Sequence, residues 1–364
     1  MQKSKISCWA LLALSLSVIS CSGDDPAWDP VVIGNPCHAI QVNDDIYQPT
    51  MWTSGNVYVI TQDIVVEDVL TIQPGVIIKS DGARIMATGD GRIIAEGNAN
   101  NHIIFTSIAD DSCCGDTNGN GTASVAQKGD WTGIYLNGGA NHSFKYCDIL
   151  YAGKDRGGFF NAVQLSVACD SFEFDHCTIA HTLSGNTNSA YAFYGSFQMQ
   201  DNNVFQFTNN VLYDNDRPLY VDSNYTVSTT NRFHNPADAT QRNTRNAIYL
   251  ADSGKSNWTV TWGVTEVPYV LKDFNQGAPN NTLNIGANVV VKFNHAIAGI
   301  SFQAARPVNL AGSAVLTSYK DDTHGGDTNG DGNASTPAAG DWDGYFNTDP
   351  NVYVSGANIL YDNH

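Results

Sequence analysis

The sequence predicts an all-β fold, a solenoid whose coils are built from short strands. No stretch shows a sustained apolar period of 3.6 residues, whereas short runs with two-residue alternation recur along the chain. Only four of the 36 acidic residues are Glu, and the many Asp residues and 33 Gly favour turns over helices. A strand pattern also returns at steps of 30 and 33 residues, which is typical of stacked coils that bury a shared core.

Residues 1–20 are expected to be a lipoprotein signal peptide. Lys3 and Lys5 precede a 15-residue apolar run, which suits a secretory signal and is shorter than the about 20 residues of a membrane span. The run ends in VISC at 18–21, where a small residue followed by cysteine resembles the lipobox of bacterial lipoproteins. This resemblance implies acylation of Cys21, which would become the mature N-terminus. The alternative is an ordinary signal peptide with an incidental cysteine.

Residues 21–49 are interpreted as a lipidated tether and the cap of the solenoid. Ser22 is followed by GDD and PAWDP, an acidic, proline-containing stretch that looks like the export signal of Bacteroidota-type surface lipoproteins. This implies a lipid anchor in the outer membrane and exposure at the cell surface. Removal of residues 1–20 takes away two lysines and no acid, so the net charge changes from −18 to −20. Nucleic acid is therefore not an expected partner, because phosphate binding needs clustered Lys and Arg.

Four segments share one strand pattern: 144–153, 174–182, 207–215 and 354–363. In each, an apolar residue is followed three places later by a small or amide residue and two places after that by Ile or Leu. Cys147 and Cys177 are interpreted as buried members of the middle column, with a disulfide between adjacent coils as the alternative. The predicted stacked columns are Phe144, Phe174, Phe207 and Val354; Cys147, Cys177, Asn210 and Ala357; and Ile149, Ile179, Leu212 and Ile359.

The alternation and the inward Asn and Cys column resemble the right-handed parallel β-helix family. The stretch LTIQPGVIIKSDGARIMATGDGRIIAEGNANNHIIFTS at 70–107 looks like its secreted bacterial surface branch. The resemblance covers roughly 50–364 and implies a single-stranded parallel β-helix with long Asp/Asn/Gly-rich loop insertions. It is specific for fold and compartment but not for activity, since this fold hosts many functions.

A larger repeat indicates an internal duplication. Residues 106–133 and 317–344 align without a gap and are identical at 16 of 28 positions, and LTIQPGVIIK at 70–79 corresponds to LNIGANVVVK at 283–292. We expect copies at about 50–153 and 258–364, joined by aromatic-rich coils at 154–257. The second copy stops at His364 without a recognisable cap, and an uncapped coil exposes pairing edges. A truncated chain, or an end that meets a partner, is expected there.

Each copy carries a loop of some twenty-three residues that contains DTNGDG or DTNGNG. Loops longer than about 12–15 residues are usually functional or disordered, and near-identity between copies argues against disorder. In copy two, Asp327, Asn329 and Asp331 alternate before Gly332 and the carbonyl of Asn333, as in an EF-hand-like calcium loop. The corresponding oxygens in copy one belong to Asp116, Asn118, Asn120 and Thr122.

The loops depart from an EF-hand at position 12, where Gln127 or Ala338 stands in place of Glu. Another carboxylate would have to complete the site, and calcium would then be structural. The alternative interpretation is favourable turn chemistry without a metal. The candidate distal ligands are Asp110, Asp111 or Asp130 in copy one and Asp321, Asp322 or Asp341 in copy two. At each loop exit, Trp131 and Trp342 are expected either to pack on the neighbouring coil or to expose a ring for sugar stacking.

No catalytic residue is assigned. The hydrolase branch of β-helix proteins has paired Asp residues, Gly-His-Gly and Arg-x-Lys, and none of these follows NTD at 347–349. Weak candidates for a lyase base are Lys154, Arg156 and Arg217, in GKDRGG and YDNDRP, with solvated turn charges as the alternative.

Two function classes remain. The first is a calcium-stabilised, non-catalytic surface lipoprotein that binds a glycan through the aromatics of the middle coils, or acts as an adhesin or structural spacer. The second is a polysaccharide-active enzyme, a lyase or glycoside hydrolase. The two differ in whether Lys154, Arg156 and Arg217 converge in one groove beside acids.

Overall fold

The computed structural model describes residues 38–139, 141–157, 160–166, 168–183, 190–195, 204–251, 257–271 and 280–364. The expected signal peptide and the lipidation site Cys21 lie outside the described residues. Within them the chain is all-β, as predicted, and contains no α-helix. None of these residues therefore forms a helix that could cross a membrane.

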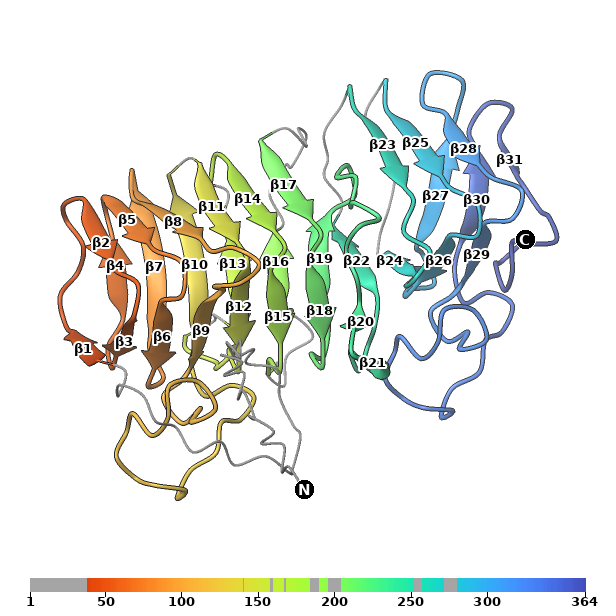
Figure 1. Cartoon of the computed structure of the whole chain (residues 1–364). Helices are drawn as coiled ribbons and strands as arrows, with labels where there is room; N and C mark the ends of the chain where they lie inside the picture. The colour runs from red at the N-terminus through yellow and green to blue at the C-terminus, as the bar shows by residue number, and fades with distance from the viewer. Residues whose placement is uncertain are drawn as a thin grey trace, which may run out of the picture. The chain divides into compact units, whose positions relative to one another are not determined.

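Three long sheets of parallel strands make up most of the fold (Figure 1). Sheet 1 contains, in spatial order, β1 (His38–Val42), β3 (Asn56–Ile60), β6 (Ile77–Ser80), β9 (Ile103–Ser107), β12 (Cys147–Leu150), β15 (Thr178–Ala180) and β18 (Val211–Tyr213). Sheet 2 contains β4 (Ile64–Val66), β7 (Arg84–Gly89), β10 (Gly133–Gly138), β13 (Val163–Leu165), β16 (Phe193–Gly195), β19 (Leu219–Asp222), β22 (Ile248–Ala251), β24 (Tyr269–Leu271), β26 (Val290–Phe293) and β29 (Val315–Ser318). Sheet 3 contains β2 (Thr50–Trp52), β5 (Val69–Ile72), β8 (Arg92–Glu96), β11 (His142–Lys145), β14 (Phe172–Asp175) and β17 (Phe205–Thr208).

Three smaller sheets lie in the C-terminal half of the chain. One is an antiparallel hairpin, and another consists of three parallel strands. In the third, two parallel strands are followed by an antiparallel one. Their strands are β20 (His234–Asn235) and β21 (Asp238–Arg242); β23 (Thr259–Trp262), β25 (Thr282–Ile285) and β28 (Val308–Leu310); and β27 (Gly299–Phe302), β30 (Gly344–Asn347) and β31 (Val352–Tyr353).

The order of the strands follows a fixed rotation. From β2 to β19 the chain visits sheet 3, sheet 1 and sheet 2 in turn. Each strand from β2 to β16 therefore pairs in parallel with the strand three places later, as in β2–β5, β3–β6 and β4–β7. Such a rotation is compatible with three-sided coils stacked on one another.

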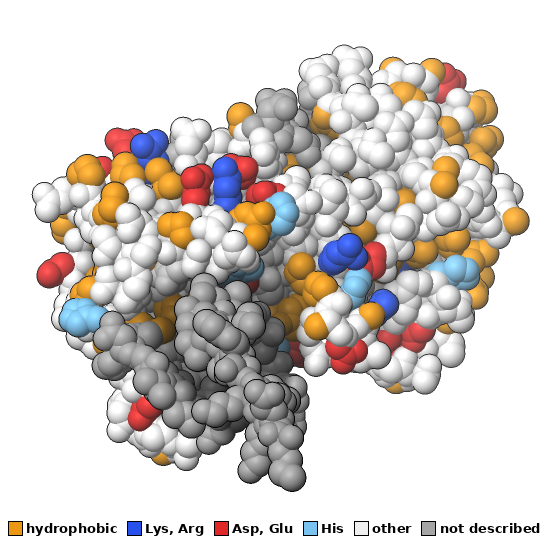
Figure 2. Space-filling model, viewed as in Figure 1, with side chains coloured by type: hydrophobic (Ala, Val, Ile, Leu, Met, Phe, Trp, Pro, Cys, Tyr) orange, Lys and Arg blue, Asp and Glu red, His pale blue; other side chains and the backbone are white. Residues whose placement is uncertain are grey.

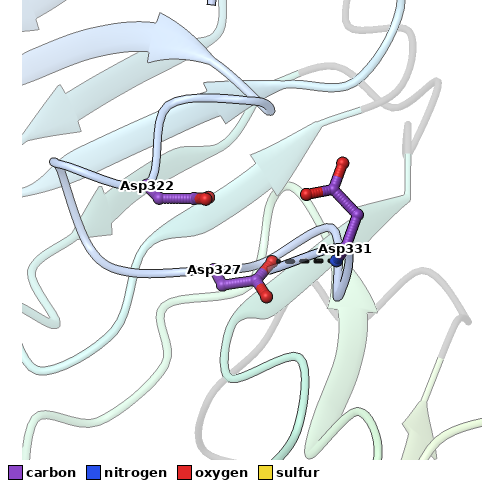
Figure 3. A group of neighbouring side chains, drawn as sticks. All are labelled: Asp322, Asp327 and Asp331. Atoms are coloured by element: carbon purple, nitrogen blue, oxygen red, sulfur yellow. Dashed lines mark hydrogen bonds between the residues drawn. The ribbon is translucent and has the colours of Figure 1, made fainter. Parts of the chain in front are cut away.

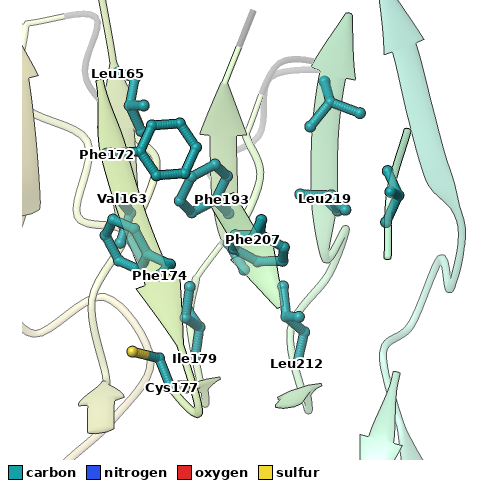
Figure 4. Packing of buried hydrophobic residues seen from close by; sticks show 14 of the residues in the cluster. Val163, Leu165, Phe172, Phe174, Cys177, Ile179, Phe193, Phe207, Leu212 and Leu219 are labelled. Atoms are coloured by element: carbon teal, nitrogen blue, oxygen red, sulfur yellow. The ribbon is translucent and has the colours of Figure 1, made fainter. Parts of the chain in front are cut away.

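The predicted columns are observed for the first three of the four segments. Phe144, Phe174 and Phe207 are neighbours in sheet 3, and the first two rings stack with centroids 4.4 Å apart. Their side chains point into the space between the sheets, as Figure 4 shows for Phe174 and Phe207. Full burial of each such ring contributes about 1.5–3 kcal/mol, so the column is a major source of stability.

The placement of the fourth segment in these columns was wrong. Ile359 pairs with Leu316 of sheet 2 and does not continue the column of Ile149, Ile179 and Leu212 in sheet 1. The reason is that Ile149 pairs with Phe105 of copy one, and Leu316 is the equivalent residue of copy two. Ile359 therefore pairs with the same position of copy two that Ile149 pairs with in copy one.

Thiol and amide groups satisfy buried backbone groups along one corner. Cys147 and Cys177 are free, buried thiols, so the interpretation as buried column members is confirmed and the disulfide alternative is wrong. Cys177 Sγ donates to the carbonyl of Phe144. In the next coil Asn210 Oδ1 accepts from Cys177 N at 2.9 Å, and Asn210 Nδ2 donates to the carbonyl of Phe174 at 3.0 Å. Of the other cysteines, Cys114 is disulfide-bonded.

The two copies share their strand register but occupy different sheets. Lys79 of β6 pairs with Thr106 of β9, and the equivalent Lys292 of β26 pairs with Thr317 of β29. In copy one these strands belong to sheet 1, and in copy two they belong to sheet 2. Each strand of this part of copy two thus lies in the sheet that follows, in the order sheet 3, sheet 1, sheet 2, the sheet of its equivalent in copy one.

Candidate metal centre in the duplicated loops

Three carboxylates come together in loop 2, residues 319–343, between β29 and β30. One carboxylate oxygen from each of Asp322, Asp327 and Asp331 lies within 4.8 Å of the other two (Figure 3). This is the spacing of groups that hold a cation in common. Two members come from the predicted alternating positions, and Asp322 is one of the three predicted distal ligands of this copy.

Backbone amides hold the first carboxylate in place. Asp327 accepts hydrogen bonds from the amides of Gly330 at 2.7 Å and Gly332 at 2.8 Å, and from that of Asp331 at 3.2 Å. Gly330 and Gly332 have φ values of 73° and 67°, which glycine adopts without steric cost. The side chain of Asn329 accepts from the Asp331 amide at 3.2 Å, so the loop turns tightly around its own oxygens.

Asp322 differs from its neighbours because its Oδ1 atom is buried and has no hydrogen-bond partner within the described parts of the chain. The equivalent Asp111 Oδ1 of loop 1 (residues 108–132, between β9 and β10) is in the same state. Burial, and then the charge of Asp327, raise the pKa of Asp322; burial and Asp116 raise the pKa of Asp111. A buried oxygen without a partner costs about 1–3 kcal/mol, and a bound cation would remove that cost.

Loop 1 repeats the geometry with one charge fewer. Asp116 accepts from the amides of Gly121 at 2.6 Å and Asn120 at 3.1 Å, and these bonds to backbone amides lower its pKa. Asn118 accepts from the Asn120 amide at 3.2 Å, as Asn329 does from Asp331. Because Asn120 stands where loop 2 has Asp331, loop 1 offers a weaker set of ligands for a divalent cation.

A buried lysine supports each loop, and sequence reasoning missed both. Lys79 Nζ donates to the carbonyl of Gly115 at 2.8 Å, and Lys292 Nζ donates to that of Gly326, the equivalent residue, at 2.6 Å. Both lysines are fully buried. Burial lowers the pKa of both, that of Lys292 to about 8, although nearby Asp carboxylates oppose the shift. A lysine at the same place in two otherwise apolar runs, VIIK and VVVK, is the signal that could have revealed them.

The remaining predicted distal ligands have structural partners. Asp321 accepts from Thr317 Oγ1 at 2.7 Å, and its counterpart Asp110 accepts from Thr106 Oγ1 at 2.6 Å. Asp341 accepts from Ser318 Oγ at 2.7 Å and from Lys320 Nζ at 2.6 Å, and Asp130 accepts from Ser107 Oγ at 2.6 Å. These four carboxylates join the ends of each loop to the preceding strand. Thr122 and Asn333, which stand at position 7 of the predicted calcium loops, are exposed.

The tryptophans at the loop exits pack inside the fold. Trp131 and Trp342 are fully buried, and the indole Nε1 atoms donate to the carbonyls of Leu150 and Leu360, each at 2.7 Å. Trp342 also stacks on Phe293, with centroids 4.1 Å apart. The expectation that they pack on a neighbouring coil is confirmed, and the alternative of exposed rings for sugar stacking is wrong.

Two of the three weak catalytic candidates, Lys154 and Arg156, lie close together, and Arg217 lies at another level of the fold. Arg156 pairs with Asp63 beside β4, at 2.8 Å, and donates to the Gly82 carbonyl, and Lys154 Nζ also lies beside Gly82. Arg217 is buried before β19, with its guanidinium 5.5 Å from the centroid of the Tyr249 ring. Four strands of sheet 2 lie between β4 and β19, about 24 Å at the usual strand spacing. The three cations therefore do not line one groove.

Tyrosines of the middle coils form a cluster on the outer side of sheet 2. Tyr194 and Tyr220 are neighbours in the register and stack with centroids 4.8 Å apart at 7°. Tyr191 and Tyr249 pack beside them, and the Tyr249 hydroxyl donates to the carbonyl of Thr328 in loop 2. The rings of this cluster pack on one another and do not form a flat platform, and Tyr249 connects the cluster to loop 2.

No family model, curated protein or solved structure matches the chain.

Proposed function

We propose that the chain is a non-catalytic, lipid-anchored surface protein with a calcium-stabilised, right-handed parallel β-helix. The fixed rotation of the strands among three parallel sheets supports the β-helix. The right hand follows from the strong general preference of parallel crossover connections. In this proposal the protein acts outside the cell as a glycan-binding, adhesive or spacer module.

One observation carries the calcium assignment: in both loops the same aspartate oxygen is buried beside a second carboxylate and has no hydrogen-bond partner among the described residues. Calcium takes six to eight oxygen ligands in flexible geometry, and the side chains of Asp322, Asp327 and Asp331 supply several of them. Asn329 and the carbonyl of Asn333 are proposed to add others, and water would complete the shell. Asp111, Asp116, Asn118 and Asn120 would hold the second ion.

The distance of Arg217 from the neighbouring side chains of Lys154 and Arg156 supports a non-catalytic role. A polysaccharide lyase or hydrolase needs its acid and base within reach of one bond. Arg156 is paired with Asp63, and Arg217 is buried beneath tyrosine rings. No observation on the described residues favours the enzyme over the binding protein.

Anchoring at the outer membrane by Cys21 completes the proposal and depends on the sequence pattern VISC alone. Equilibrium dialysis of the full chain against radioactive calcium tests the metal assignment. We expect two bound ions, one of higher and one of lower affinity, and a loss of the stronger site in Asp327→Ala. Absence of binding at 5 mM calcium would contradict the proposal.

A further inference from the structure

A cavity of about 500 Å³ lies beside the last strand of sheet 1, away from the loops. Its lining includes His176, Asn209, Thr230, Arg232 and Glu266. Its size is within the range of about 300–1,000 Å³ that is usual for small-ligand sites. The cavity lies where β18 is extended by only a single bridge, between Val211 and Arg232.

The cavity begins where a column of rings stops. Tyr146, His176 and Asn209 occupy equivalent corners between sheets 3 and 1, and all have left-handed backbone, with φ values of 48°, 55° and 56°. The Tyr146 and His176 rings stack with centroids 4.7 Å apart at 17°. Asn209 has no ring, and its amide donates to Asp175 at 2.7 Å. The short side chain leaves space where the third ring of the column would lie.

Fixed polar groups surround this space. Glu266 Oε1 accepts from the Phe233 amide at 3.0 Å and contacts His234 Nδ1 at 2.6 Å, so its carboxylate is held in place. His176 Nδ1 is 2.8 Å from Asp175 Oδ2, which fixes the imidazole ring. Within the described residues, the exposed Arg232 guanidinium forms no ion pair or hydrogen bond. Its five donors are therefore available to a ligand.

The balance of charge indicates the class of ligand. One cation, Arg232, and one anion, Glu266, line the cavity together with hydroxyl and amide groups that both donate and accept. Sugar hydroxyls also donate and accept, and a neutral sugar adds no charge to a protein that carries −18. On the face drawn in Figure 2, Lys and Arg side chains form small separate groups, so that face has no basic patch for an acidic polymer.

We propose that this cavity is a subsite for one ring of a neutral glycan. The pyranose ring stacks on His176 and continues the column of Tyr146, while Arg232 and Glu266 hydrogen-bond its hydroxyls. This inference rests on the proposed function in one respect, because it places the cavity outside the cell, where glycans are met.

The test is a binding screen of the full chain. The probes are neutral hexasaccharides of α-glucose, β-glucose, mannose, xylose and N-acetylglucosamine, with tetragalacturonate as the acidic comparison. The variant Asn209→Tyr fills the column with a ring, and Tyr146 shows that tyrosine adopts this left-handed backbone. Arg232→Ala removes the donor. Lys154→Ala, which removes an exposed cation elsewhere, is the matched control.

We expect at least one neutral probe to bind, saturation-transfer NMR to detect it, and calorimetry to give its affinity. Arg232→Ala should weaken that binding by about tenfold or more, as for a lost hydrogen bond to a charged group. Asn209→Tyr should abolish it without lowering the melting temperature by more than a few degrees, and Lys154→Ala should leave it unchanged.

Three results would overturn the inference: no neutral probe binds, tetragalacturonate binds in preference, or a neutral probe binds equally to all variants. Each can be separated from failure of the proposed function. Lipid labelling at Cys21 and calcium-dependent stability are measured on the same chain without any glycan.

Discussion

Lys292 Nζ donates a 2.6 Å hydrogen bond to the carbonyl of Gly326, and so connects the buried surface of sheet 2 to the base of loop 2. Lys79 and Gly115 have the same relationship in loop 1. Each loop is therefore bound to the preceding sheet by a buried lysine, and its carboxylates lie within the loop itself. This arrangement explains how a long segment with little apolar surface keeps one conformation.

Lys292→Met should loosen loop 2, because it leaves the Gly326 carbonyl and the Thr328 hydroxyl without their donor. Each unsatisfied group costs about 1–3 kcal/mol, partly offset by the burial cost of the ammonium that is removed. Limited proteolysis with mass spectrometry should show faster cleavage within residues 320–340 but unchanged cleavage in loop 1. Lys79→Met should give the reverse pattern, and identical patterns in both variants would contradict this view.

The lowered pKa of Lys292 predicts a pH dependence of stability. Burial lowers the pKa of the Lys292 amine to about 8 in the folded chain, compared with its ordinary value of 10.5 in the unfolded chain. Between these values the unfolded state binds more protons, so this group makes the free energy of unfolding rise with pH. Melting in EGTA at pH 7.5 and pH 9.5 should show this contribution in the parent chain and its absence in Lys292→Met. An equal pH response in both proteins would exclude it.

Asp322→Asn separates a metal ligand from a structural acid. In EGTA the substitution should leave the melting temperature unchanged or raise it, because it removes a desolvated charge next to Asp327. In calcium it should lower the melting temperature relative to the parent protein. Asp341→Asn is the matched control: it should lower the melting temperature under both conditions, since Asp341 accepts from Ser318, Lys320 and the Ala338 amide. Similar behaviour of the two variants would remove Asp322 from the proposed site.

Asn210→Ala should destabilise the packing between sheet 3 and sheet 1. It leaves the Cys177 amide and the Phe174 carbonyl unsatisfied in the interior, and the expected loss is about 2 kcal/mol or more in the free energy of unfolding. Chemical denaturation measures this loss, with the exposed Asn100→Ala as a control that should change little. Equal stabilities of the two variants would show that the buried amide is dispensable.

Cys21→Ala tests the anchor. Metabolic labelling with a palmitate analogue should mark the parent protein and leave the variant unlabelled, because the proposed acylated residue is then missing. Label that persists in the variant would show that the lipid, if any, is elsewhere.

The sequence predicted the first three members of each strand column and the clustering of loop carboxylates because both depend on local repetition. Phe144, Phe174 and Phe207 stand at one fixed position of a repeated strand pattern. Asp327 and Asp331 stand four places apart, with Asn329 halfway between them, so one turn brings them together. The shift of the second copy from sheet 1 to sheet 2 could not be predicted. It depends on the number of strands between the copies, and the turns at 154–257 carry no signal as strong as the repeat.

The site was predicted only in part for a similar reason. Asp322 and Asp341 are equivalent candidates in sequence, and only the fold shows that Asp341 is bonded to Ser318 while Asp322 Oδ1 has no partner in the described structure. The supporting lysines were missed because a single cation in an apolar strand is a weak signal until its duplicate is noticed.

Calorimetry of the full chain in EGTA and in calcium is the most direct test of the central claim that the duplicated loops bind calcium. At 1 mM calcium, dissociation constants of 10⁻⁴–10⁻³ M would add roughly 0.4–1.4 kcal/mol per site. We therefore expect a rise in melting temperature of roughly 1–4 °C that magnesium does not reproduce. Asp327→Ala combined with Asp331→Ala should remove most of this rise, and Asp116→Ala should remove less of it. An unchanged melting temperature of the parent protein in 5 mM calcium would contradict the account, and DTNGDG would then be a turn without a metal.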